Sequence, residues 1–195
     1  DELYEFCQNH INFFTDHGTT TIEAKSGYGL TLEDELKSLR VIKRLNENSH
    51  LDLVPTFMGA HDFPKEFKDN KNSYVNLICE EMIPAVAAEK LAEYCDVFCE
   101  RGYFSTDQSI RILETAKQYG LKPRLHADEF EDSDGASLAA KVGAISADHL
   151  MAVSKMGINE MKKSGVIATL LPGTTFFLGK NTYANGRKII DMGCN

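Results

Sequence analysis

The sequence predicts an α/β protein of the (β/α) TIM-like barrel type, incomplete, with about six of the eight strand–helix units. Short apolar runs rich in Val, Ile and Thr alternate with helical patterns along all 195 residues, and this order is typical of parallel sheets covered by helices. No GxGxxG follows the first run and no GxxxxGK[ST] occurs, which disfavours a nucleotide-binding doubly wound sheet. A complete barrel has eight strands in about 250 residues, so six strands predict an incomplete one.

Six segments are expected to form the strands, and each is short enough to cross a covered parallel sheet once. They are residues 19–24, 51–57, 96–100, 122–127, 144–147 and 166–171.

Helices are predicted between these strands by capping residues and by apolar positions at helical spacing. Thr31 opens one in the sequence TLED, Ser105 opens another in STDQ, and Ser154 opens a shorter third. These are the residue types that accept hydrogen bonds from the first free amides of a helix. Residues 73–94 also show a helical pattern, in which Pro84 is expected to cause a kink or a break.

The composition excludes several classes of partner. The net charge is −8 and no basic stripe appears, which argues against binding to nucleic acid or to an anionic membrane surface. No apolar run approaches the roughly 18 residues that cross a bilayer. A small molecule is the expected partner, and a homodimer is compatible with the sequence.

The cysteines indicate a reducing compartment, and we expect a cytoplasmic protein. Their number, five, is odd and no CxxC pair occurs, so a disulfide framework is not expected. Cys95 and Cys99 lie four residues apart along a predicted strand, a separation of roughly 13 Å, too far to share one metal ion or a disulfide.

Three histidines stand at or just after the ends of predicted strands: His61, His126 and His149. A single histidine in such a place is more often structural, but a barrel brings the carboxyl ends of its strands to one pocket. Imidazole nitrogens bind Zn²⁺ and Fe²⁺ well, and a bound metal can activate water. The sequence therefore predicts a metal-dependent or proton-transfer site at this end of the barrel.

Acidic residues surround His126 in the stretch PRLHADEFED. Glu131 and Asp132 are expected to lie in a solvated turn, whereas Glu129 faces the pocket if the strand ends at Ala127. The periodicity leaves both orientations of Glu129 open.

Two loops after strands carry further candidates. In AKSGYGLT, Lys25 and Tyr28 are a cation and a phenol that could bind an anionic substrate. In PGTTFFLG, Phe176 and Phe177 are expected to belong to the core rather than to a substrate wall.

Six motifs taken together resemble the imidazolonepropionase family of the amidohydrolase superfamily. They are IEAKSGYGL, FMGAHDFP, VFCERGYF, LHADEF, ADHL and LLPGTTFFLG, in that order and across essentially the whole chain. The resemblance implies a TIM-like barrel beside a small β-sandwich domain and one divalent metal, Zn²⁺ or Fe²⁺. It implies hydrolysis of 4-imidazolone-5-propanoate to N-formimino-L-glutamate in histidine degradation.

The same resemblance assigns roles to individual residues. His126 matches the metal ligand of the fifth barrel strand. Glu129 matches a glutamate that contacts the substrate ring and assists proton transfer, and His149 matches a catalytic histidine near the attacking water. Tyr28 and His61 match positions that contact the substrate.

The remaining ligands of the family, a His-x-His pair and a strand-eight aspartate, have no counterpart within residues 1–195. We therefore expect these residues to be the internal part of a barrel domain, without the flanking strands and the β-sandwich, and inactive on their own. Two alternatives stay open: another amidohydrolase-type cyclic amidase or deaminase, and a non-catalytic (β/α) protein that binds a small ligand.

Overall fold

Six parallel strands form one sheet in the computed structural model, which describes residues 1–195. The strands lie side by side in chain order, each paired only with its neighbours in sequence. The expected barrel-type fold and its six strands are confirmed, with boundaries shifted by a few residues. The strands are β1 (Thr21–Lys25), β2 (Asp52–Ala60), β3 (Tyr94–Cys99), β4 (Lys122–Ala127), β5 (Ser146–His149) and β6 (Ile167–Thr169).

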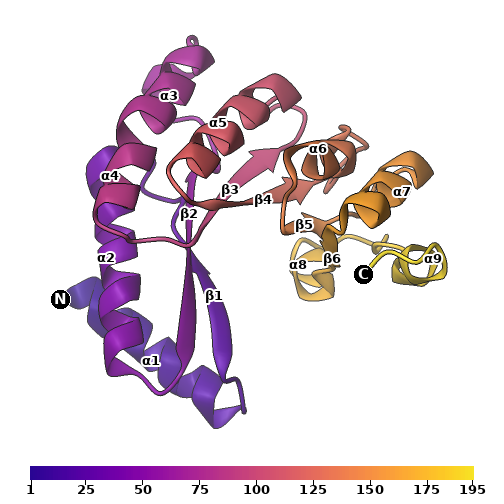
Figure 1. Cartoon of the computed structure of the whole chain (residues 1–195). Helices are drawn as coiled ribbons and strands as arrows, with labels where there is room; N and C mark the ends of the chain where they lie inside the picture. The colour runs from indigo at the N-terminus through magenta and orange to yellow at the C-terminus, as the bar shows by residue number, and fades with distance from the viewer.

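Helices connect the strands and cover the sheet, with α2, α5, α6 and α7 packed on the strands they follow or precede (Figure 1). None is long and apolar enough to cross a membrane. The α-helices are α1 (Glu2–Asp16), α2 (Leu32–Asn48), α3 (Lys71–Leu77), α4 (Ile83–Ala88), α5 (Thr106–Gln118), α6 (Gly135–Val142), α7 (Lys155–Ser164), α8 (Pro172–Phe177) and α9 (Gly186–Asp191).

The predicted capping residues begin three of these helices. Ser105 and Gln108 form both halves of a capping box at α5. Thr31 and Ser154 each accept a hydrogen bond from the backbone N–H three residues later. Pro84 lies at the start of α4, directly after a π-helical turn (Ile78–Met82) that separates α4 from α3. The chain thus accommodates the proline, which lacks an amide hydrogen, in a locally widened helix.

The sheet curls strongly, and two ion pairs across its concave side show this. Strands β1 and β5 would lie roughly 19 Å apart in a flat sheet, at about 4.8 Å per strand. Lys25 of β1 nevertheless reaches Asp148 of β5 with 3.1 Å between Nζ and Oδ2. Arg124 of β4 likewise lies 3.0 Å from Glu23 of β1. The six strands therefore form a half-barrel whose concave side carries charged side chains.

The two faces of the sheet differ in chemistry. Along β4, Leu125 and Ala127 are fully buried toward the helices, whereas Arg124 and His126 point to the concave side and are partly exposed. The apolar core consequently lies between the sheet and the helices, where Leu39, Ile112 and Leu138 join it. The expectation that Phe176 and Phe177 belong to this core is wrong: they are 78% and 86% exposed on α8.

Candidate active site

The three strand-end histidines lie at the same end of the half-barrel. His61 directly follows β2, His126 lies in β4 and His149 ends β5. The rings of His126 and His149 are 5.0 Å apart between centroids. Phe98 stands between His61 and His126, with ring distances of 6.1 Å and 5.6 Å. The curl of the sheet thus places the three imidazoles along one rim, as the sequence predicts.

His126 is held by a buried carboxylate. Its Nδ1 lies 3.0 Å from Oδ1 of Asp96, whose side chain is fully buried in β3. Burial opposes ionisation of Asp96, but His126 and Lys25 outweigh it and keep the pKa of Asp96 well below its usual range. An ionised carboxylate only accepts hydrogen bonds, so Nδ1 carries the proton. In the neutral imidazole, the free electron pair of His126 is then on Nε2.

Lys25 forms ion pairs with three carboxylates inside the half-barrel. Its ammonium contacts Asp96 at 2.5 Å, Asp148 at 3.1 Å and Glu23 at 3.5 Å. Burial by itself lowers the pKa of Lys25, but the three carboxylates raise it well above its usual range. The hypothesis that Lys25 binds an anionic substrate is therefore wrong, because its charge is already neutralised inside the barrel.

The site can hold a metal ion, and His126 is the side chain best placed to bind it. Asp96, His126 and Asp148 offer one ligand atom each within 4.8 Å of one another. However, Asp96 already binds His126 and Lys25, and Asp148 binds Ser146 and Lys25. Nε2 of His126 has no such partner. A histidine whose other nitrogen donates to a carboxylate is the usual form of a metal ligand, so the geometry of His126 fits a divalent metal.

Glu129 and His149 form a second buried pair beside His126. Glu129 is 6% exposed, and its Oε1 lies 3.5 Å from Nδ1 of His149. This separation exceeds a normal hydrogen bond, and Nδ1 of His149 has no other partner. Burial, followed by the neighbouring His126, lowers the pKa of His149 to about 4. Burial raises the pKa of Glu129. At neutral pH His149 is therefore a neutral imidazole with an unused nitrogen.

The backbone at these positions adopts an uncommon conformation. Asp128, His149 and Leu150 have φ values of 51°, 74° and 56°, in the left-handed region. This conformation costs free energy for residues that have a side chain, and residues that adopt it cluster at functional sites. The cost is offset at Leu150, whose N–H donates to the carbonyl of Ala127 at the end of β4.

The acidic residues after β4 make different contacts. Asp128 is buried and accepts the N–H groups of Ser133, Gly135 and Ala136, which fixes the loop and the first turn of α6. Glu131 forms a surface ion pair with Arg101 at 2.9 Å. Of the acids in this stretch, Glu129 is therefore the one that the fold turns toward the histidines.

Tyr28 and His61 lie side by side on neighbouring loops. Their rings are 4.9 Å apart in an edge-to-face arrangement, and Tyr28 is 89% exposed. Nδ1 of His61 lies 2.8 Å from the carbonyl oxygen of Gly27 and donates to it, so Nε2 of His61 is the nitrogen left for a ligand.

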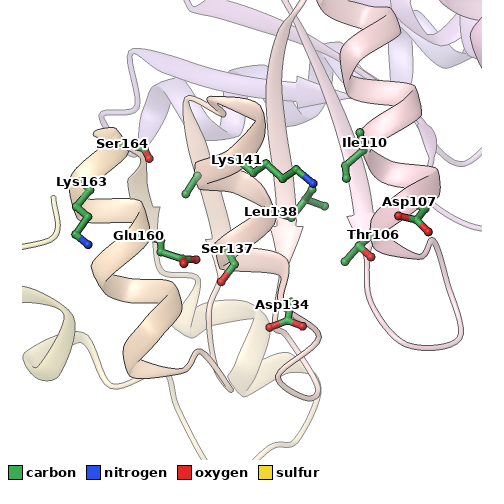
Figure 2. Close-up of a pocket in the computed structure, with 11 residues that line it drawn as sticks. Thr106, Asp107, Ile110, Asp134, Ser137, Leu138, Lys141, Glu160, Lys163 and Ser164 are labelled. Atoms are coloured by element: carbon green, nitrogen blue, oxygen red, sulfur yellow. The ribbon is translucent and has the colours of Figure 1, made fainter.

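Cavities lie both beside this site and away from it. A small one of about 110 Å³ is bordered by His149, Leu171 and Tyr183. A larger hollow of about 540 Å³ lies between α5, α6 and α7 on the outer helical layer (Figure 2). Charged side chains of both signs, such as Asp107, Lys141 and Glu160, line it. It contains no histidine and lies on the opposite side of the sheet from the concave face, so it does not belong to the candidate site.

The two carboxylates that support His126 and Lys25 are not among the residues predicted from the sequence. Asp96 and Asp148 appear in the sequence as single acids inside otherwise apolar strands. That signal could have marked them, because a charge in a covered strand must find a partner.

Comparison with known proteins identifies the family. Over 193 residues the chain is 57% identical to the imidazolonepropionase of Brevibacillus brevis, which covers 99% of this chain. It is 52% identical over 193 residues to that of Thermoanaerobacter pseudethanolicus, again over 99% of this chain. The chain belongs to the imidazolonepropionase family. It spans less than half the length of these imidazolonepropionases, 45% and 46% respectively. No protein-family model matches the chain.

Several solved structures share the fold of this chain at low sequence identity. An adenine deaminase from Arthrobacter aurescens aligns with a TM-score of 0.70 at 12% identity, over 97% of this chain and 59% of the other. A guanine deaminase from C. acetobutylicum, solved with bound guanine, aligns with a TM-score of 0.68 at 18% identity, over 96% and 48%. An adenosine deaminase from Xanthomonas campestris, solved with bound zinc, aligns with a TM-score of 0.60 at 14% identity, over 91% and 40%. The likeness supports the barrel-type fold.

Proposed function

We propose that the protein carrying these residues hydrolyses the cyclic amide 4-imidazolone-5-propanoate to N-formimino-L-glutamate, in histidine degradation. The observation that carries the proposal is the grouping of His126, Glu129 and His149 at the ends of adjacent strands. The relatives named imidazolonepropionase, at 52–57% identity, favour this reaction. The deaminase alternative has support from the fold alone.

The proposed reaction adds one water across a ring C–N bond. The water oxygen forms a bond to the ring carbonyl carbon, and the C–N bond to the ring nitrogen breaks. One proton of the water ends on the leaving nitrogen, and the new carboxyl group ionises. The reaction needs an activated water, a polarised carbonyl and a proton donor to nitrogen.

The buried pair has two roles in this scheme: His149 stabilises charge and Glu129 transfers a proton. His149 is a neutral imidazole with an unused nitrogen. It can therefore donate a hydrogen bond to the carbonyl oxygen of the substrate as negative charge develops there. Glu129 has a raised pKa because of burial, which suits a carboxyl group that accepts and returns a ring N–H proton. Tyr28 and His61 stand on the rim, where they would contact the substrate.

His126 is proposed to bind one divalent metal, Zn²⁺ or Fe²⁺, through Nε2. When bound, the metal would supply an activated water as the nucleophile. The fit of His126 to this role lies in its Nδ1–Asp96 hydrogen bond, which keeps Nδ1 as the donor and leaves Nε2 as the nitrogen that a metal would bind in place of a proton. One structural neighbour is an adenosine deaminase with bound zinc, which is consistent with Zn²⁺.

We further propose that residues 1–195 are the internal part of a metal-dependent hydrolase barrel domain. The flanking barrel strands and a small β-sandwich domain would lie outside these residues. All five cysteines are free thiols, which supports a cytoplasmic location. The proposed partners are a small-molecule substrate and, in a homodimer, a second copy.

A segment exchange tests the function directly. In the Brevibacillus brevis relative, the segment that matches residues 1–195 would be replaced by these residues, giving a chimeric enzyme that has complete flanks. Turnover is followed as loss of the ultraviolet absorbance of imidazolonepropionate with added Zn²⁺ or Fe²⁺. We expect the chimeric enzyme to be active, its Glu129→Gln variant to be strongly impaired, and the 195-residue chain alone to be inactive. A folded, metal-loaded chimera without turnover would refute the proposal.

A further inference from the structure

Glu35 is a fully buried glutamate in the first turn of α2. Its side chain is 0% exposed, and no lysine, arginine or histidine forms an ion pair with it. Burial of a carboxylate without a cation is costly unless hydrogen bonds replace its hydration. Glu35 is thus held by hydrogen bonds and not by an ion pair.

One oxygen of Glu35 accepts hydrogen bonds from three backbone amides of the loop between β1 and α2. Oε1 accepts from the N–H groups of Gly27 at 3.2 Å, Gly29 at 3.1 Å and Leu30 at 3.0 Å. The other oxygen, Oε2, is buried and has no hydrogen-bond partner. All hydrogen bonds of this side chain are thus made by Oε1, which anchors the backbone of residues 27–30.

This loop needs an anchor because its backbone is strained and tightly packed. Gly27 has a φ of 116°, and a Cβ at this position would come within 2.8 Å of the carbonyl oxygen of Met58. Leu30, which has a side chain, has a φ of 57°. Such conformations persist only where the surroundings fix them. The three bonds to Glu35 do so from beneath the loop.

The anchored loop sets the position of both rim residues. Gly27 supplies the carbonyl oxygen that accepts the Nδ1–H of His61 at 2.8 Å. Tyr28 is the next residue, and its ring packs edge-to-face on that of His61. Because the amides on either side of Tyr28, those of Gly27 and Gly29, bind the same oxygen, Glu35 fixes the loop that carries both contacts.

We infer that Glu35 is a positioning residue that orders the loop of residues 27–30 and thereby holds Tyr28 and His61 for substrate binding. Glu35 itself is buried beneath the loop and touches no substrate. The part of the inference that concerns substrate rests on the proposed function; the part that concerns loop order does not.

The test compares two variants of Glu35 with a matched control on the same helical turn. Glu35→Ala removes the anchor, and Glu35→Gln keeps one accepting oxygen without the charge. Glu33→Gln is the control, because Glu33 is an exposed acid in the same first turn of α2. This substitution also replaces a glutamate by glutamine near the N-terminus of the helix, but its side chain is far less buried. Hydrogen–deuterium exchange of residues 26–31 and the Nδ1–H resonance of His61 are measured in the 195-residue chain and in the chimeric enzyme.

We expect exchange of the amides of Gly27, Gly29 and Leu30 to rise at least about tenfold in Glu35→Ala, since all three hydrogen bonds to the carboxyl oxygen are lost. Glu35→Gln should restore part of the protection, and Glu33→Gln should change nothing. The His61 Nδ1–H resonance should weaken or shift in Glu35→Ala alone. Unchanged exchange in that variant would overturn the inference.

In the chimeric enzyme, the same variants separate positioning from general loss of structure. Glu35→Ala should raise KM about tenfold while kcat stays within about threefold, as expected when uniform substrate binding is lost. Tyr28→Phe should raise KM in the unaltered background but not further in Glu35→Ala, because coupled residues are non-additive. Loop exchange that rises while KM and the Tyr28→Phe effect stay the same would overturn the substrate part. If the unaltered chimera has no turnover, the proposed function fails, and the exchange and His61 data still decide the role of Glu35 in the loop.

Discussion

Nδ1 of His126 lies 3.0 Å from Oδ1 of Asp96, and this hydrogen bond connects the rim of the half-barrel with the charges in its interior. Asp96 in turn binds the ammonium of Lys25, which also binds Asp148. His126 is therefore oriented by a buried charge network and not by its strand alone. A small change at Asp96 should alter the position and basicity of Nε2 of His126, the nitrogen proposed to bind a metal.

The first prediction concerns Asp96→Asn in the chimeric enzyme. The amide still accepts a hydrogen bond from His126 but lacks the charge that orients the imidazole and makes it more basic. We expect metal affinity to fall by about 10- to 100-fold, measured by competition with a chelating dye. The matched control is Asp148→Asn, which also loses a bond to Lys25 but has no hydrogen bond to His126. Equal losses in the two variants would show that Asp96 does not act through His126.

The second prediction separates His126 from His149. His126→Ala removes the proposed ligand and should lower both bound metal and turnover. His149→Ala should lower turnover by about 10²- to 10³-fold, the range for a lost hydrogen-bond donor to a developing oxyanion, while leaving more of the metal bound. Plasma mass spectrometry of the purified variants gives the metal content. The same metal loss in both variants would mean that His149 is a ligand.

The third prediction concerns Lys25 and the stability of the interior network. Lys25→Met leaves Asp96 and Asp148 buried without their cation, and should lower the free energy of unfolding at pH 7 by roughly 3–5 kcal/mol. The measurement is urea denaturation. Lys37→Met is the control, because Lys37 is exposed and 4.0 Å from Asp34; it should change stability by less than about 0.5 kcal/mol.

The same pair has an expected pH dependence. Lys25 has a raised pKa in the folded chain, so its contribution is complete below about pH 10 and is lost as the pH rises through the folded pKa. Asp96 has a lowered pKa, so its contribution is complete above about pH 4 and is lost in acid. The difference between Lys25→Met and the unaltered chain should therefore shrink as the pH falls below about 4. A difference that stays constant into acid would contradict the ion-pair assignment.

The fourth prediction concerns the thiols. Cys95 and Cys99 are buried in β3, and burial raises the pKa of both, that of Cys99 to about 11. Since the thiolate is the reactive form, iodoacetamide at pH 7.5 should leave both unmodified while it labels the half-buried Cys7. Mass spectrometry of peptides locates the labels, and labelling in denaturant should reach all five cysteines. Rapid native labelling of Cys99 would show that β3 opens or is misplaced.

The class of fold and the places of its strands follow from local patterns in the sequence. The apolar runs and the caps at Thr31, Ser105 and Ser154 are local signals, because capping bonds and helical spacing involve residues a few positions apart. The rule that parallel strands end at one rim then placed His61, His126 and His149 together. The sequence does not predict the orientation of Glu129, since a turn after a strand has no fixed period.

Which charges meet inside the barrel follows from the folded chain and not from any local pattern. Lys25 looked like a substrate-binding cation because it precedes a glycine-rich loop, yet the curl of the sheet brings it to Asp96 and Asp148, 71 and 123 residues away. The three amide bonds to Glu35 were likewise invisible, because nothing in the sequence shows where a side chain on a helix will meet a loop. Such contacts depend on how far the sheet curls and on which buried charges must find partners, and both follow from packing of the whole chain.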